Sequence, residues 1–148
     1  MKAIPLNSYH LPTCAKMYVT TFNGPPWFDK WTQDTAHKRL EDIMDSPGFI
    51  GMAVAVDDQL RAAVFGNIES WYEGKMFTLK EMFVHHEEKG RGLGTFLMEA
   101  LEVELAKMNV TSISLFTSKG DLTEKFYMKN GFESDNDMTM MSKSLAAI

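Results

Sequence analysis

Three glycines stand at alternate positions directly before an apolar helical pattern. Gly90, Gly92 and Gly94 fall in the stretch EEKGRGLGTFLMEALEVEL, residues 87–105. Each glycine weakens a helix by roughly 0.5–1 kcal/mol relative to alanine, so the backbone there must serve another purpose. The first amides of a helix are unsatisfied and carry about half a positive charge, and glycine leaves them accessible. The pattern therefore indicates a strand–loop–helix cradle for a phosphate or a similar anion.

The spacing of these glycines matches neither of two familiar phosphate-binding fingerprints. Dinucleotide-binding loops use Gly-x-Gly-x-x-Gly, and P-loops use Gly-x-x-x-x-Gly-Lys-Ser/Thr. A tight turn from a strand into a helix would also explain the glycines. On these residues alone, both interpretations stay open.

The strand expected before the loop changes its apolar phase part-way along. Phe77 and Leu79 share one parity, whereas Met82 and Val84 share the other. A regular strand keeps one parity on its buried face, so we expect a β-bulge near Lys80–Met82. Burial of both faces is the alternative. A bulge would splay this strand from its next neighbour and leave backbone groups with which an extended ligand can pair.

The remaining pattern predicts one mixed α/β domain over residues 1–148. Helical spacing of apolar residues predicts helices, and short runs bounded by turn signals predict strands, with Thr32 as an expected N-cap. The expected helices cover residues 11–22, 32–45, 93–108 and 121–131. The expected strands cover residues 2–9, 49–58, 60–72, 75–86 and 112–118, with a last strand or pair within 132–145.

Composition excludes several classes of function. The net charge of −5 gives no basic field that would hold nucleic acid or an anionic membrane. Cys14 is the only cysteine, so an internal disulfide and a cysteine-built metal site are excluded. Four histidines without spaced acidic partners predict no metal site either. No apolar run approaches the ~20 residues of a membrane span, and the N-terminus lacks a signal-peptide pattern, so we expect a cytoplasmic protein.

Two segments resemble motifs of the GNAT superfamily of N-acetyltransferases. KEMFVHHEEKGRGLGTFLMEALE resembles motif A, Arg/Gln-x-x-Gly-x-Gly/Ala after a bulged strand, here as Lys89-x-x-Gly92-x-Gly94. KFYMKNGF resembles motif B, with an aromatic–Tyr pair before Gly-Phe. The resemblance implies an α/β (α+β) fold whose mostly antiparallel central sheet is splayed between two strands and flanked by helices.

The resemblance also implies acetyl-CoA as the cofactor. The backbone of Met82, Phe83 and Val84 would pair with the pantetheine arm. The residues that would hold the pyrophosphate are Lys89, Gly90, Arg91, Gly92, Leu93, Gly94 and Thr95. Lys89 replaces the usual Arg or Gln and keeps the charge without the planar geometry. Gly120 and Thr123 stand where the family often has Asn and Ala.

Acetyl transfer to an amine needs a neutral amine, a donor to the thioester oxygen and a proton for the departing thiolate. Carried over by position in motif B, Tyr127 would be the acid, or else an aromatic core residue. Glu81, at the expected bulge, is the leading base, acting directly or through water, or else a surface residue paired with Lys80 or Lys75. His85 and His86 are alternative bases, and as neighbours on a strand they would face opposite sides.

Aromatic residues before motif A are the expected walls of the acceptor site. They are Trp27, Trp31, Trp71 and Tyr72, and Asp29, Glu69 and Glu73 lie close to them in the sequence. Aromatic faces beside carboxylates suit a cation, which favours a small-molecule amine such as an aminoglycoside or polyamine. The tryptophans could instead be hydrophobic plugs or a dimer contact, and a homodimer stays open. The alternatives for function are a non-catalytic acyl-CoA-binding regulatory module and an acetyltransferase for protein or peptide amines.

Overall fold

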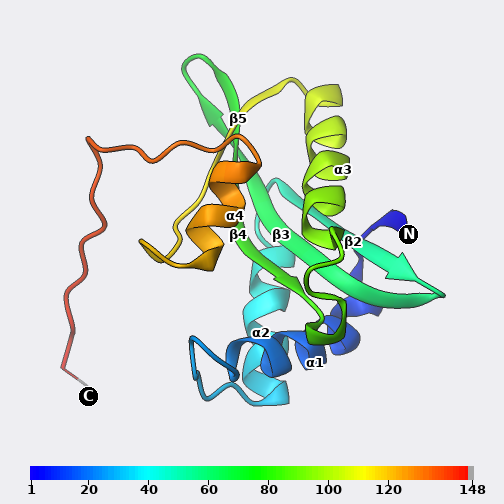
Figure 1. Ribbon diagram of the computed structural model, residues 1–148. Helices are drawn as coiled ribbons and strands as arrows, with labels where there is room; N and C mark the ends of the chain where they lie inside the picture. Colours follow the sequence, from blue (N-terminus) through cyan, green and yellow to red (C-terminus); the bar gives the residue numbers. More distant parts are fainter. Residues whose placement is uncertain (147–148) are drawn as a thin grey trace. The chain divides into compact units, whose positions relative to one another are not determined.

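The structure is a computed structural model that describes residues 1–146 (Figure 1). Its internal contacts divide the chain into two compact units, Met1–Phe116 and a second that begins at Thr117. Each unit is described by itself below.

The first unit is built on a five-stranded sheet in the order β1-β2-β3-β4-β5. Its strands are β1 (Lys2–Pro5), β2 (Phe49–Val56), β3 (Gln59–Trp71), β4 (Gly74–Val84) and β5 (Val110–Ser114). The first four strands pair antiparallel and β5 runs parallel to β4, as the crossover through a helix requires. The predicted mixed, mostly antiparallel sheet is confirmed.

Three helices pack on this sheet: α1 (Leu11–Phe22), α2 (Gln33–Met44) and α3 (Leu93–Lys107). Local signals set their ends. Thr32 caps α2 as predicted, because its side chain accepts from the Thr35 amide and the Thr35 hydroxyl accepts in return. Short 3₁₀ turns, η1 (Ser8–His10) and η2 (His86–Glu88), precede α1 and α3. The first strand ends at Pro5 rather than at residue 9, because the Asn7 side chain caps η1.

The two faces of the sheet are covered by different helices. α1 and α2 form one core with strand residues that include Ala53, Ala63, Phe65 and Phe83. Side chains alternate along a strand, so their neighbours face α3, which contacts β2, β3, β4 and β5. The buried residues of α3 are Leu93, Leu97, Met98, Leu101 and Leu105.

The predicted β-bulge lies at Lys80. Phe65 pairs with Glu81 and the next residue, Gly66, pairs with Leu79, so Lys80 has no partner of its own in β3. The extra residue reverses the alternation and returns Met82 to the face on which Leu79 lies. The parity change in the sequence is thereby explained, although the opposite face of β4 is also buried at Phe83.

The predicted splay begins two residues before the bulge. Within the described chain, β5 pairs with β4 only from Lys75 to Thr78. We expected β5 at residues 112–118, but it starts at Val110, directly after Asn109 ends the helix with φ of 61°. It ends at Ser114 because β4 offers no paired partner beyond Thr78.

In the second unit, residues 117–146 contain one helix, α4 (Leu122–Lys129), and the sequence predicts a helix over 121–131. The Asp121 side chain caps it by accepting from the Thr123 amide. The strand or pair expected within 132–145 is wrong: the described residues there form turns and irregular chain. Asp135 and Asp137 make a local turn instead, and Met138, Met140 and Met141 are exposed.

Candidate active site

The loop before α3 forms an open backbone cradle. Gly90 and Gly92 both have φ of +79°, a left-handed conformation that favours glycine. Gly92 is the N-cap of α3, and no side chain of the described part of the protein caps the helix. A Cβ atom built at either glycine would meet nothing within 4 Å. No side chain of the described residues therefore accepts from the first-turn amides, an arrangement typical of helix N-termini that bind anions.

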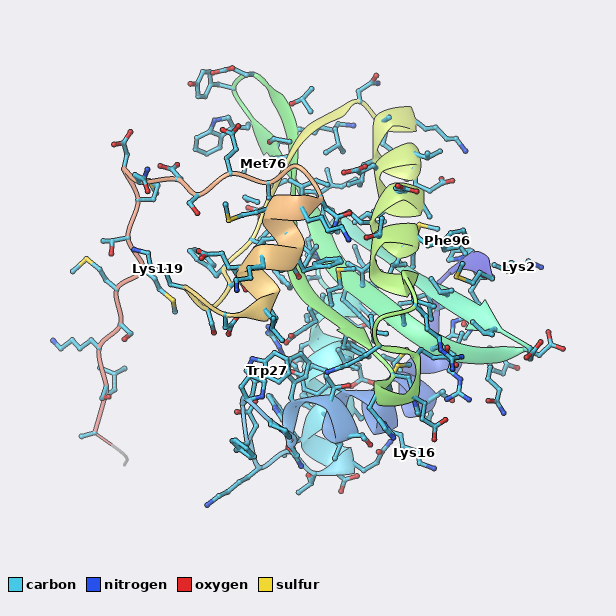
Figure 2. All side chains as sticks on the ribbon, viewed as in Figure 1. Lys2, Lys16, Trp27, Met76, Phe96 and Lys119 are labelled. Atoms are coloured by element: carbon cyan, nitrogen blue, oxygen red, sulfur yellow. The ribbon has the colours of Figure 1, made fainter. Side chains whose placement is uncertain are left out.

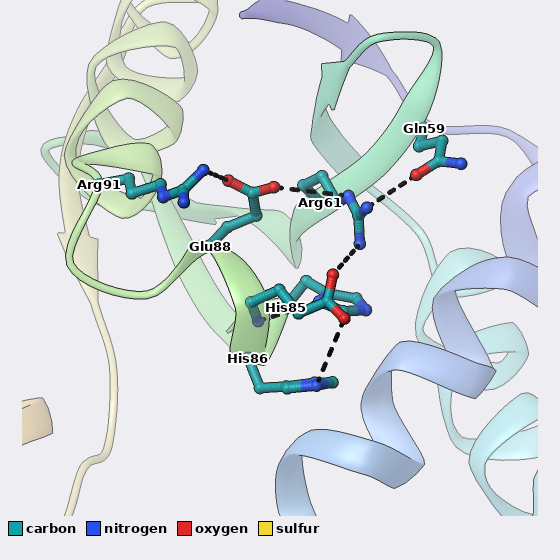
Figure 3. A network of polar contacts seen from close by, with 7 residues as sticks. Gln59, Arg61, His85, His86, Glu88 and Arg91 are labelled. Atoms are coloured by element: carbon teal, nitrogen blue, oxygen red, sulfur yellow. Dashed lines mark hydrogen bonds and ion pairs between the residues drawn. The ribbon is translucent and has the colours of Figure 1, made fainter.

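The two cations of the cradle are tied to different parts of the first unit. Lys89 Nζ lies 5.9 Å from the centroid of the Trp27 ring. The Arg91 guanidinium lies 3.5 Å from Glu88, and its amide donates to the Glu88 carbonyl oxygen. Glu88 is buried and also lies 3.7 Å from Arg61 of β3 (Figure 3). Glu88 thus links the loop to the sheet.

His85 and His86 do not lie on a strand, contrary to the prediction. β4 ends at Val84, and the two imidazole rings stack on one another with centroids 4.5 Å apart (Figure 3). His85 accepts from the Glu87 amide through Nδ1. Desolvation by burial, together with Arg61 nearby, lowers the pKa of His85. Strand alternation does not apply after β4, so His85 and His86 are not required to face opposite sides.

Glu81 is held by residues that the sequence reasoning missed. Its Oε2 accepts from the Tyr18 hydroxyl at 2.8 Å and from Arg39 Nε at 3.0 Å. The side chain of Glu81 is 14% exposed. The expected alternative, pairing with Lys80 or Lys75, is wrong, because the bulge turns Glu81 toward α1 and α2. Burial and the adjacent Glu81 carboxylate raise the pKa of Tyr18, so its phenol stays a donor.

The loop between α1 and α2 places two of the predicted aromatic residues near this group. The Asn23 side chain clamps the loop, since it accepts from the Trp31 amide at 2.8 Å and donates to the Trp31 carbonyl at 2.9 Å. The Trp31 ring lies edge-on to Tyr18 with centroids 5.0 Å apart, and its Nε1 donates to Asp29. Trp27, labelled in Figure 2, lies on the same loop.

Trp71 and Tyr72 lie elsewhere. They form the exposed tip of the β3–β4 hairpin, with ring centroids 5.7 Å apart. Trp71 pairs with Gly74, at the opposite end of β4 from Val84. At ~3.3 Å per strand residue, this tip is about 30 Å from the cradle end of β4. The structure therefore does not bring these two aromatics together with Trp27 and Trp31.

Tyr127 lies on α4 in the second unit. Its ring makes edge contacts with Phe126 and Phe132, with centroid distances of 5.2 and 5.4 Å.

Cys14 is fully buried, and burial raises the pKa of its thiol to about 12, so it is no nucleophile. Within residues 1–146, no cluster of three or more metal-ligating side chains occurs, and no helix is both long and apolar enough to span a bilayer.

Comparison with known proteins decides the family. The sequence matches the acetyltransferase (GNAT) domain over residues 48–134, a stretch that includes the bulged strand, the glycine cradle and α4. The chain belongs to the GNAT acetyltransferase family. The predicted enzyme class, an acetyltransferase, is thereby confirmed at the level of the family. No curated protein sequence matches the chain.

Solved structures of this GNAT fold resemble the chain over nearly its whole length. A possible acetyltransferase from Clostridium difficile 630 has a TM-score of 0.80 at 16% identity, covering 99% of this chain and 98% of that one. Aminoglycoside N-acetyltransferase AAC(6')-Iy, in complex with CoA, has a TM-score of 0.77 at 17% identity, with coverage of 97% and 95%. An aminoglycoside acetyltransferase from an uncultured soil metagenomic sample, in complex with sisomicin, has a TM-score of 0.75 at 12% identity, with coverage of 98% and 96%.

Proposed function

We propose that this GNAT protein transfers an acetyl group from acetyl-CoA to a primary amine of a small molecule. The amine attacks directly in a ternary complex, without a covalent enzyme intermediate. The observation that carries the proposal is the uncapped, glycine-rich N-terminus of α3. It follows, after η2, a bulged strand that has no β5 partner beyond Thr78.

The cradle and the strand edge would hold two parts of the cofactor. The main-chain groups of Met82, Phe83 and Val84 follow the bulge and would pair with the pantetheine arm. The loop amides from Lys89 to Thr95 would hold the pyrophosphate, although the Arg91 amide already donates to Glu88. Lys89 and Arg91 would add positive charge. Bound acetyl-CoA supplies the thioester.

Glu81 and Tyr127 are the proposed catalytic residues. Oε2 of Glu81 is engaged by Tyr18 and Arg39, and we assign Oε1 to the acceptor, whose ammonium it would bind and deprotonate. Tyr127 would donate its phenolic proton to the departing thiolate, as its position in motif B implies. Proton transfer of this kind contributes typically 10²–10⁴-fold to a rate.

The α1–α2 loop is the proposed wall of the acceptor site. Trp27 and Trp31 offer aromatic faces, and Asp29, fixed by the Trp31 indole, offers a carboxylate. Aromatic faces and a carboxylate favour a cationic amine. The aminoglycoside acetyltransferases among the similar structures support the same class of acceptor.

Release of free thiol from acetyl-CoA, measured across a panel of aminoglycosides, polyamines and peptides, tests this function. We expect turnover with at least one small amine and product that carries one acetyl group by mass. CoA binding without turnover on any amine would instead indicate an acyl-CoA-binding regulatory module. Turnover on peptides alone would overturn the small-molecule assignment.

A further inference from the structure

We propose that Tyr18 and Arg39 are positioning residues of the acceptor site, an inference that rests on the proposed function. Together they fix one oxygen of Glu81 and leave the other for the acceptor amine. Neither residue belongs to the motifs that indicated the family. Each contacts Glu81 and would act through it.

The geometry of the group comes from three elements. Tyr18 reaches Glu81 from α1 and Arg39 reaches it from α2, and both donate to the same oxygen, Oε2. Glu81 itself stands on β4 directly after the bulge at Lys80. Two donors at 2.8 and 3.0 Å on one oxygen restrict the torsions of a carboxylate that would otherwise rotate.

The residues around Glu81 leave Tyr18 and Arg39 as the partners of its carboxylate. Its paired residue on β3 is Phe65, which brings no charge. Within residues 1–146, the side chains that hydrogen-bond to the Glu81 carboxylate are those of Tyr18 and Arg39. A carboxylate with 14% exposure needs such partners, because burial of an unpaired charge is costly. Arg39 is 42% exposed, so the ion pair lies at the edge of the core and not inside it.

Tyr18 is suited to a clean substitution. Its ring packs against Phe22, Trp31 and Phe83, and Tyr18→Phe keeps that packing while removing the hydroxyl. Arg39→Met keeps the length of the side chain and removes its charge at a half-exposed position. Matched controls exist nearby: Tyr9→Phe on η1, where the residue is 91% exposed, and Lys38→Met, beside Arg39 on α2.

The test is a double-mutant cycle with Glu81→Gln, with kcat and KM for the amine and Kd for CoA as readouts. We expect Tyr18→Phe and Arg39→Met each to lower kcat/KM for the amine by about 10- to 100-fold, since both remove a hydrogen bond to a charged group. In the Glu81→Gln background, each of these two substitutions should change kcat/KM for the amine by less than about twofold. Arg39→Lys should recover part of the loss. CoA affinity and the two controls should stay at the wild-type value.

The outcomes separate this inference from the function on which it rests. Equal losses in the wild-type and Glu81→Gln backgrounds would mean that Tyr18 and Arg39 act only through the core, which overturns the inference and leaves acetyl transfer intact. Loss of CoA affinity in Tyr18→Phe would overturn it as well. A wild-type protein that acetylates no amine would overturn the proposed function, and the inference with it.

Discussion

Gly90 and Gly92 have the same left-handed backbone and the same open space where a Cβ would stand. Gly120 and Gly131 also combine a left-handed backbone with open space, so open space alone does not identify a ligand site, whereas Gly92 is in addition the N-cap of a helix that no described side chain caps. At Gly90 and Gly92 the freed space faces outward. In the proposed function, glycine serves both the backbone angle and the approach of the pyrophosphate.

Substitution of Gly92 separates these two roles. Asp and Asn have nearly the same size, and both tolerate the left-handed region better than other side chains, so they strain the loop equally. Only Asp brings a negative charge to the cradle. We expect Gly92→Asp to abolish measurable CoA binding, with an affinity about 100-fold or more below that of Gly92→Asn, measured by calorimetry. Equal affinities in two variants of equal thermal stability would contradict a pyrophosphate site here.

Tyr127 is tested by removal of its hydroxyl alone. Tyr127→Phe keeps the ring contacts with Phe126 and Phe132, so α4 should remain folded. If the phenol protonates the thiolate, kcat should fall by about 10²–10⁴-fold while the Kd for CoA changes little. Tyr9→Phe is the matched control. A normal turnover rate in Tyr127→Phe would remove this residue from the mechanism.

At the scale of elements, the bulge in β4 sets the direction in which the proposed base, Glu81, points. One unpaired residue, Lys80, turns Glu81 toward α1 and α2 and directs Met82 to the α3 face. The same strand has no β5 partner after Thr78, and in the proposed function an extended ligand pairs with that edge. The loop between α1 and α2 then adds Trp27 beside Lys89.

Substitution of Asn23 tests whether the α1–α2 loop shapes the acceptor site. Its side chain makes two hydrogen bonds to the Trp31 backbone, and Asn23→Ala removes both. We expect KM for the amine to rise about tenfold with kcat largely kept, and the free energy of unfolding to fall by about 1–2 kcal/mol. Thr20→Ala, on the same helix, removes a local hydrogen bond to Lys16 and is the control. An unchanged KM for the amine would separate the loop from acceptor binding.

Elements whose ends are decided locally could be predicted from the sequence. α1 was expected at the residues where it lies, Thr32 was recognised as a cap, and the parity change gave the bulge. Contacts between distant residues could not be predicted. Tyr18, Arg39 and Glu81 come from three elements, and no spacing rule links them. The strand expected within 132–145 failed for a related reason: apolar alternation does not supply the hydrogen-bonded neighbour that a strand needs.

At the scale of the whole molecule, the chain carries a net charge of −5, whereas the proposed cofactor is an anion. Lys89 and Arg91 bring positive charge to the cradle, where Arg91 also pairs with Glu88. Elsewhere the acidic excess favours approach of a cation, as the proposed acceptor would be. The two ligands should therefore respond to salt through different parts of the protein.

The dependence of activity on salt concentration tests whether the acidic excess guides a cationic acceptor to the protein. The Debye length falls from about 10 Å at 0.1 M salt to about 3 Å at 1 M, so long-range attraction between the acidic protein and a polycation is screened. With acetyl-CoA saturating, we expect kcat/KM for spermine to fall several-fold between about 0.05 and 0.5 M salt, whereas kcat/KM for phenethylamine, a monocation, should change less than about twofold. Equal salt dependence for the two amines would mean that the net charge does not guide the acceptor. Recognition would then depend on short-range contacts at Glu81, Asp29 and the two tryptophans of the α1–α2 loop.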